Sequence, residues 1–316
     1  MYEEMKDKGI SIIVPFLNEE EGIGEFCKKI DEYSLSLSFP LEIVFVDDGS
    51  SDDTIKKIEG IEWKNIRKVR IVSLSKNYGS HAAVRAGLQY AYYDICTWMG
   101  SDGQDPMEML EIGYKKIKEE NYDAVYIDKK SVAVSKANRL FSKIYSYLMQ
   151  KYAVKSYSSG GTADIIFNRK IKDLLNQNVE GNSSIMLQIM DMGFKYFTVS
   201  LAFNERGSGT SKWTLSKKIK LFIDSFVAFS FMPIRFVSMI GIVMFFVGIS
   251  TGVYSIINKL FNPEAPLGYT TLVCIIAVGF GITNISLGII AEYLWRTYDA
   301  ARRRPVFIVS EVFEVK

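Results

Sequence analysis

The stretch ISIIVPFLNEEE, residues 10–21, joins an apolar run to an acidic segment, and this pattern sets the expected fold class. The apolar run Ile10–Pro15 predicts a buried β-strand, and Glu20–Ser34 has the apolar spacing of an amphipathic helix. A buried strand followed by a helix is the repeating unit of α/β domains with a largely parallel sheet. The stretch therefore predicts the first unit of an α/β domain.

The same alternation continues along the chain to about Lys195. Segments such as Ser80–Tyr92 again have helical spacing, and they separate further apolar runs that predict strands. In open sheets of this kind, ligands bind at the carboxyl ends of the strands. We therefore expect functional residues just after the predicted strands, which are Glu42–Val46, Val69–Leu74, Ile95–Met99 and Ala124–Ile127.

The loop after the second predicted strand is rich in acceptors. Asp47 and Asp48 come directly after the strand, and Gly49 permits a tight turn. The carboxylates could accept hydrogen bonds from a nucleobase or ribose, whereas Ser50 or Asp52 could cap the next helix. The residues alone leave both roles open.

The loop after the fourth predicted strand reads MGSDGQDP, residues 99–106. A hard cation such as Mg²⁺ takes oxygen ligands from one or two carboxylates, from substrate phosphates and from water. Asp102 and the side-chain carbonyl of Gln104 could therefore bind Mg²⁺ or Mn²⁺ without a side chain at Gly100. The pair Asp105-Pro106 equally suits the start of a helix.

Two long uncharged stretches, Phe236–Ile257 and Tyr269–Ala291, predict a transmembrane hairpin. The alternative is a pair of buried helices in a soluble core. Basic residues flank the hairpin on its outer sides, which places both ends in the cytosol. The N-terminal MYEEMKDKG lacks the apolar region of a secretory signal, so the front of the chain is expected to stay cytosolic.

Composition excludes other classes. The net charge of +2 is too small to indicate nucleic-acid binding, so none is expected. The three cysteines are scattered, which favours a reducing compartment and neither a disulfide framework nor a zinc site.

Five motifs occur along the chain in a recognisable order. They are Ile12–Glu21, Val46–Ser50, Leu74–Gly79 with Ala86–Leu88, Ser101–Pro106, and Arg206 followed by Gly209–Trp213. With these motifs the chain resembles the inverting GT-A-fold glycosyltransferases that load sugars onto polyprenyl phosphate, namely dolichol-phosphate mannose synthases and bactoprenol glucosyltransferases. The resemblance implies a Rossmann-like GT-A domain over residues 1–212, interfacial amphipathic helices over 213–235, the transmembrane hairpin over 236–294 and a cytosolic tail over 295–316.

The resemblance implies transfer of one sugar from a UDP- or GDP-sugar to polyprenyl phosphate, with Mg²⁺ or Mn²⁺ as cofactor. It also implies a multi-pass protein of the inner membrane, and self-association through the hairpin or the tail is expected. Carried over by position, the nucleotide ligands are Pro15, Leu17, Glu19, Asp47, Asp48 and Lys76; the metal ligands are Asp102 and Gln104; the catalytic residues are Asp102, Arg206 and Asp164; and the lipid phosphate is bound by Arg206, Ser211 and Lys212.

This sequence departs from the family pattern at three places. Gly100 replaces the first acidic residue of the usual Asp-Xaa-Asp, and Ala163 competes with Asp164 for the position of a family carboxylate. A basic Gly-Xaa-Arg stretch is represented by residues 127–130, IDKK. Because a lipid phosphate is already anionic, a general base is not essential to the reaction.

Two other functions fit the sequence. The departures at Gly100 and Ala163 motivate a catalytically silent membrane-bound nucleotide-sugar binder. A processive polysaccharide synthase also has a GT-A domain beside membrane helices, but the Gln-Xaa-Xaa-Arg-Trp motif is not found here. The single histidine, His81, is interpreted as a helix-start residue that packs beside the nucleotide loop.

Overall fold

The computed structural model describes residues 8–130, 146–147, 149–151, 154, 157, 162–180, 184–204, 232–262, 268–302 and 304–315. The chain divides into two compact units, Met1–Ser225 with Pro305–Lys316, and Phe226–Arg304. The finer boundaries at residues 212, 235 and 294 stay predictions, and the first of these lies outside the described residues.

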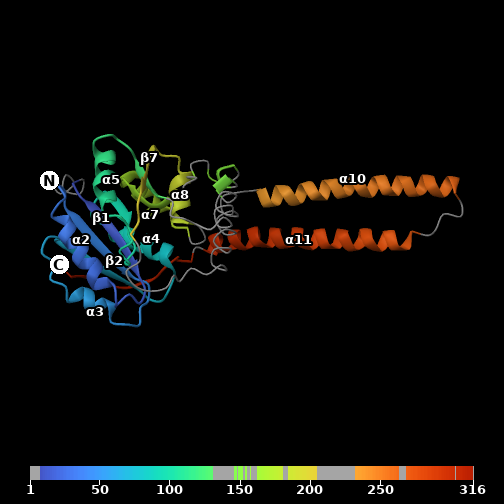
Figure 1. The fold of residues 1–316 in the computed structure, drawn as a ribbon. Helices are drawn as coiled ribbons and strands as arrows, with labels where there is room; N and C mark the ends of the chain where they lie inside the picture. The colour runs from blue at the N-terminus through green and yellow to red at the C-terminus, as the bar shows by residue number, and fades with distance from the viewer. Residues whose placement is uncertain are drawn as a thin grey trace. The chain divides into compact units, whose positions relative to one another are not determined.

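The first unit is an α/β domain (Figure 1). Its sheet has eight strands in the order β7-β5-β6-β4-β1-β2-β3-β8. The pairs β1–β2, β1–β4, β2–β3 and β5–β7 are parallel. The sheet is mixed rather than largely parallel, because β6 runs antiparallel to β4 and β5, and β8 runs antiparallel to β3. The strands are β1 (Ile10–Phe16), β2 (Leu41–Asp47), β3 (Lys68–Leu74), β4 (Ile95–Trp98), β5 (Ala124–Lys129), β6 (Thr162–Phe167), β7 (Tyr196–Leu201) and β8 (Val309–Glu314).

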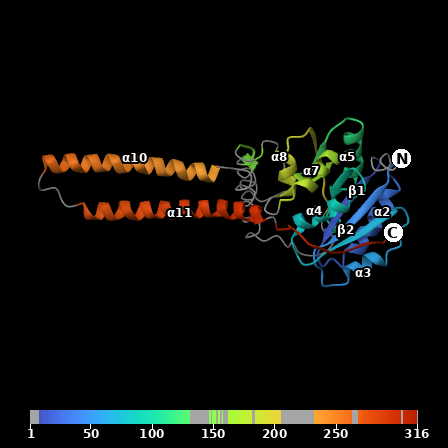
Figure 2. The same cartoon turned by 180° about the vertical axis from the view of Figure 1, so that it is seen from behind.

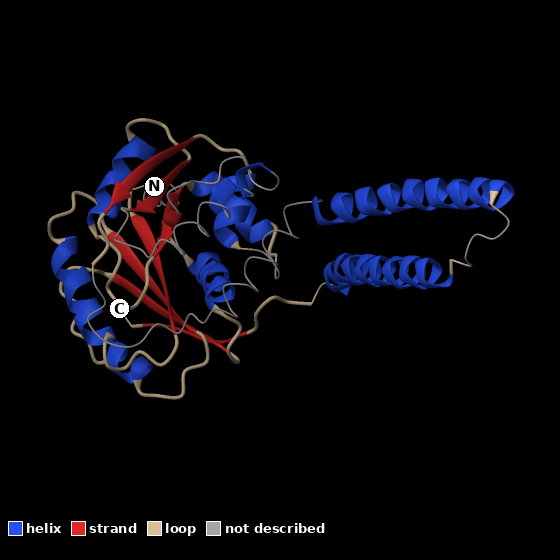
Figure 3. Ribbon diagram, turned by 45° about the vertical axis from the view of Figure 1, so that its right-hand side comes forward, coloured by secondary structure: helices blue, strands red, loops and turns tan. Residues whose placement is uncertain are grey.

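Helices cover both faces of the sheet (Figure 3). Successive side chains of a strand point to opposite faces, so a strand that is apolar throughout, such as β1, needs cover on both faces. Ile12 and Val14 join the core cluster that contains the buried residues of α2, α3 and α5. On the other face, a Cβ added to Gly87 of α4 would lie 2.6 Å from Ile13, so only glycine allows this close packing. The helices are α2 (Ile23–Ser34), α3 (Thr54–Glu59), α4 (Ser80–Tyr90), α5 (Glu108–Lys118), α7 (Arg169–Gln177) and α8 (Ile185–Asp191).

Some element boundaries differ from those predicted. Helix α2 begins at Ile23 rather than Glu20, because the preceding acidic residues belong to a loop that hydrogen-bonds to the segment after β2. The predicted C-terminal tail contains the edge strand β8 at Val309–Glu314.

The second unit contains α10 (Met232–Phe261) and α11 (Tyr269–Arg302), which lie side by side (Figures 1 and 2). Their large apolar side chains are widely exposed, and Leu260 and Phe280 retain 74% and 70% of their accessible surface. Among the described residues, one window is apolar and long enough to cross a membrane, Val278–Trp295 in α11. The two-span transmembrane hairpin therefore stays a prediction.

Candidate active site

The loops after β1 and β2 are joined by hydrogen bonds at the carboxyl edge of the sheet. Asn18 has a positive φ of 52°, its backbone N–H donates to Ser50 Oγ over 3.0 Å, and its Oδ1 accepts from the Ser51 N–H over 2.8 Å. The backbone N–H of Glu19 donates to Thr54 Oγ1 over 3.0 Å. The loop that contains Leu17 and Glu19 is thus held against the loop that follows Asp47.

Both aspartates after β2 have partners within the chain. Asp47 Oδ1 accepts from the Ser50 N–H over 2.8 Å. Asp48 accepts from the backbone N–H groups of Tyr78 and Gly79 over 2.7 and 2.9 Å, so it ties the end of β2 to the loop after β3. Burial raises the pKa of Asp48, while these two N–H donors oppose the rise. Sequence reasoning missed this structural role; carboxylates can accept further bonds, so nucleotide binding stays a prediction.

Lys76 lies at the same edge because of a close backbone contact. Gly49 has a φ of +82°, and a Cβ there would lie 2.8 Å from the Lys76 carbonyl carbon. Only glycine combines this conformation with this approach. The Lys76 ammonium lies 5.1 Å from the ring centroid of Tyr78, at the end of the sheet where a nucleotide is expected.

The segment after β4 forms a compact turn that we call the acidic corner, residues 100–105. Gly103 has a φ of +67°, Asp102 Oδ1 accepts from the Gln104 N–H over 3.3 Å, and the Asp105 carboxylate accepts from the Gly100 N–H. The predicted metal ligands Asp102 and Gln104 therefore lie together at the carboxyl end of β4.

Asp164, on β6, is buried next to the acidic corner. Its side chain is 5% exposed, and its Oδ2 atom has no hydrogen-bond donor among the described residues. Burial raises the pKa of Asp164 well above its ordinary value, the charges of Asp105 and Asp102 raise it further, and a hydrogen bond from Trp98 opposes the rise. Burial likewise raises the pKa of Asp105 to about 6, against the hydrogen bond from Gly100. Ionising both neighbouring carboxyl groups at once is therefore costly, because their negative charges repel each other.

The donor chemistry of this corner fits a hard divalent cation. Asp102 and Gln104 offer oxygen ligands, and the buried Asp164 oxygen adds an unsatisfied acceptor nearby. Within the described ranges, no three His, Cys, Asp or Glu side chains are arranged to hold a metal by themselves. Substrate phosphates and water would complete the coordination, as is usual for Mg²⁺.

The chain approaches the acidic corner again after β7. The backbone N–H of Asn204 donates to the carbonyl oxygen of Gln104 over 2.9 Å. Lys129, at the end of β5, acts electrostatically on Asp105, and its ammonium lies 5.0 Å from the ring centroid of Phe203. Sequence reasoning left Asn204 and Lys129 out of the site; the IDKK stretch was the only signal for the lysine. Arg206, Ser211 and Lys212 lie outside the described residues.

His81 is the second residue of α4, as predicted for a helix-start residue. Burial, and then the nearby charge of Arg85, lowers its pKa to about 4. The imidazole is therefore neutral at physiological pH. A group with this pKa is poorly matched to proton transfer near pH 7.

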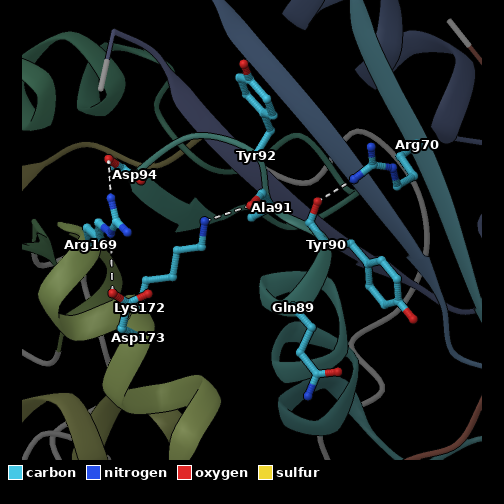
Figure 4. A pocket seen from close by; sticks show the side chains of 9 residues that line it. All are labelled: Arg70, Gln89, Tyr90, Ala91, Tyr92, Asp94, Arg169, Lys172 and Asp173. Carbon is cyan, nitrogen blue, oxygen red and sulfur yellow. Dashed lines mark hydrogen bonds and ion pairs between the residues drawn. The ribbon is translucent and has the colours of Figure 1, made fainter. Parts of the chain in front are cut away.

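A pocket of about 330 Å³ lies between the carboxyl end of α4 and helix α7, beside the residues that precede β4 (Figure 4). Lys172 donates to the carbonyl oxygens of Ala91 and Tyr93 over 2.7 and 3.0 Å, and Arg70 donates to that of Tyr90. The last carbonyl oxygens of a helix have no N–H partner within the helix, and these two cations donate to carbonyl oxygens at and just after the end of α4. The cations of this pocket therefore stabilise the end of α4.

The chain is similar to known glycosyltransferases. It is 30% identical to the uncharacterized glycosyltransferase YkcC of Bacillus subtilis, over 97% of this chain and 94% of the relative. It is 28% identical to an undecaprenyl-phosphate 4-deoxy-4-formamido-L-arabinose transferase of Proteus mirabilis, over 97% and 94%. A mannosyltransferase of Pyrobaculum calidifontis, solved with GDP-Man and Mn²⁺, is 16% identical over 93% of this chain and 88% of its own, with a TM-score of 0.43.

The doubly wound mixed sheet and these relatives define the class of protein: it is a glycosyltransferase. Residues 11–186 match the model of glycosyl transferase family 2, and the chain belongs to this family. The GT-A fold class and the resemblance to polyprenyl-phosphate glycosyltransferases are thereby confirmed.

Proposed function

We propose that this protein transfers one sugar from a UDP- or GDP-sugar to polyprenyl phosphate in a single inverting displacement. The observation that carries the proposal is the acidic corner: Asp102 and Gln104 lie together at the carboxyl end of β4, where open α/β sheets bind ligands. The printed names of relatives that act on undecaprenyl phosphate support the acceptor class.

The reaction places one main demand on the site. An oxygen of the lipid phosphate attacks the anomeric carbon, and the bond from that carbon to the nucleoside diphosphate breaks, so negative charge grows on the leaving group. A bound Mg²⁺ or Mn²⁺ supplies positive charge that stabilises this leaving group. Asp102 and Gln104 would hold that ion.

Three residues that follow β7 in the sequence are proposed to bind phosphate groups. The planar guanidinium of Arg206 suits bidentate contact with phosphate oxygens. Ser211 and Lys212 would hold the lipid phosphate, and the bond from Asn204 to Gln104 joins the start of this segment to the acidic corner. Pro15, Leu17, Glu19, Asp47, Asp48 and Lys76 would bind the nucleotide.

Asp164 is the candidate proton acceptor. It is buried beside the acidic corner, and its Oδ2 atom has no hydrogen-bond donor among the described residues, so this oxygen can accept a proton. It would take a proton from a singly protonated lipid phosphate, whereas the fully ionised phosphate needs no base.

The exposed apolar surfaces of α10 and α11 support a membrane location. We propose that both helices span the inner membrane, with the catalytic domain in the cytosol, where nucleotide sugars are made available to the site. Self-association of the hairpin is part of the same proposal.

A transfer assay tests the proposed function. Full-length protein in detergent is incubated with labelled UDP- and GDP-sugars, polyprenyl phosphate and Mg²⁺ or Mn²⁺. We expect a chloroform-soluble monosaccharide lipid with inverted anomeric configuration, and Asp102→Ala should abolish it. Donor binding without product would instead favour a silent binder, and a polymeric product would favour a processive synthase.

A further inference from the structure

The acidic corner contains a carboxylate that neither the sequence pattern nor the proposed function assigns. A Cβ added to Gly100 would lie 3.0 Å from Asp102 Oδ1 and 3.5 Å from Asp105 Oδ2. Both acidic side chains therefore surround the point where a side chain of residue 100 would begin. The neighbourhood that an aspartate at position 100 would occupy already contains the carboxylate of Asp105.

The Asp105 carboxylate is held in this position by the backbone. Its Oδ2 atom accepts from the Gly100 N–H, which fixes it against the end of β4. The residue as a whole is partly exposed, whereas Asp164 is buried, and the Asp105 carboxyl group is enclosed on the side of Asp164. A carboxylate has about four lone-pair positions, so the bonds with the Gly100 N–H and with Asp164 leave others to bind a cation.

We propose that Asp105 supplies the second acidic group of the metal site, in place of the carboxylate that is missing at Gly100. This inference rests on the proposed function, because it concerns the same divalent cation. Gly100 is then the residue that leaves room for Asp105, and its N–H orients the substitute carboxylate.

The geometry gives the proposal a specific consequence. A side chain at position 100 would crowd Asp102, because 3.0 Å is shorter than an ordinary contact between a methyl carbon and an oxygen. It would also add a third negative charge beside Asp102 and Asp105. An aspartate at position 100 should therefore help metal binding only when Asp105 is neutralised.

Manganese binding measured by electron paramagnetic resonance tests this without any transfer reaction. Full-length protein in detergent is titrated with Mn²⁺ in the presence of UDP, and circular dichroism verifies that each variant is folded. We expect Asp105→Asn to weaken Mn²⁺ binding by about tenfold, the lower end of the effect of losing a metal-site group. Glu111→Gln, an exposed acid on α5, is the matched control and should leave the affinity unchanged.

The double variant Gly100→Asp/Asp105→Asn should bind Mn²⁺ more tightly than Asp105→Asn alone, whereas Gly100→Asp alone should not exceed the unmodified protein. Unchanged affinity in Asp105→Asn, combined with loss in Asp102→Asn, would overturn the proposal and leave the metal site standing. Unchanged affinity in Asp102→Asn would overturn the metal site itself. Tighter binding by Gly100→Asp alone would also contradict the proposal, whether or not Asp105→Asn folds.

Discussion

The backbone N–H of Asn204 donates a hydrogen bond of 2.9 Å to the carbonyl oxygen of Gln104. This bond joins the segment after β7 to the acidic corner after β4, and Asn204 precedes Arg206 by only two positions. One main-chain contact therefore links the residues proposed for the lipid phosphate to those proposed for the metal.

Removing this backbone donor should impair transfer. Asn204→Pro lacks the N–H, whereas Asn204→Ala keeps it and loses only the 3.5 Å side-chain contact with Gly103. We expect Asn204→Pro to lower kcat/KM by about tenfold, equivalent to ~1.4 kcal/mol, and Asn204→Ala to change it little. Initial rates of lipid product formation measure both. Equal rates in the two variants would show that the main-chain bond does not position the segment.

Asp48 should contribute to stability independently of nucleotide. The two oxygens of Asp48 each accept one of the bonds from Tyr78 and Gly79, and asparagine keeps only one acceptor oxygen, so Asp48→Asn leaves a partly buried N–H without its acceptor. Such a loss lowers the free energy of unfolding by about 1–3 kcal/mol. For a domain of this size, each kcal/mol lowers the Tm by roughly 2–4 °C. Melting curves without UDP measure it.

The control is Asp53→Asn, which removes a surface ion pair with Lys56 and should be nearly neutral. If Asp48→Asn melted like the unmodified protein but no longer bound UDP, Asp48 would be a ligand residue without the structural role assigned to it.

Asp164 should make the metal-free protein less stable as the pH rises. Its pKa is raised in the folded state, so the folded state binds more protons than the unfolded chain between the ordinary and the raised pKa. Stability therefore falls as the pH increases through this window. An asparagine side chain cannot ionise, so Asp164→Asn should melt several degrees higher than the unmodified protein at pH 8 in EDTA, with a smaller difference at pH 5. A difference that grows toward acidic pH would contradict the assigned direction.

The predicted hairpin can be tested at its link. Asn262 directly follows α10 and is exposed, so Asn262→Cys offers an accessible thiol. If both helices span the membrane, a membrane-impermeant maleimide should label this cysteine in right-side-out vesicles. Cys27 and Cys96 are buried in the catalytic domain and should stay unlabelled. Labelling of Asn262→Cys only after permeabilisation would place the link on the cytosolic side and exclude a two-span hairpin.

The local pattern of the sequence predicted the strands β1 to β5 closely, because each is an apolar run followed by a polar loop. It did not predict β6 or β7. The short run at Thr162–Phe167 is paired antiparallel between β4 and β5, and this pairing depends on residues distant in sequence. The register of β8 against β3 likewise depends on a pairing that local periodicity does not contain.

The acidic corner was predicted only in part. The oxygen-ligand preference of Mg²⁺ and the position after the fourth predicted strand indicated Asp102 and Gln104. The return of Asp105 toward Gly100 depends on backbone geometry, including the positive φ of Gly103. The role of Asp48 depends on the N–H groups of Tyr78 and Gly79, which belong to a loop after another strand.

The central claim is that the acidic corner binds the divalent cation of a sugar-transfer reaction. Crystals of the full-length protein grown with UDP and Mn²⁺, and measured near the manganese absorption edge, test it most directly. We predict an anomalous peak in contact with the Asp102 carboxylate, the Gln104 side chain and the diphosphate. Bound UDP with no manganese peak at residues 100–105 would contradict the claim.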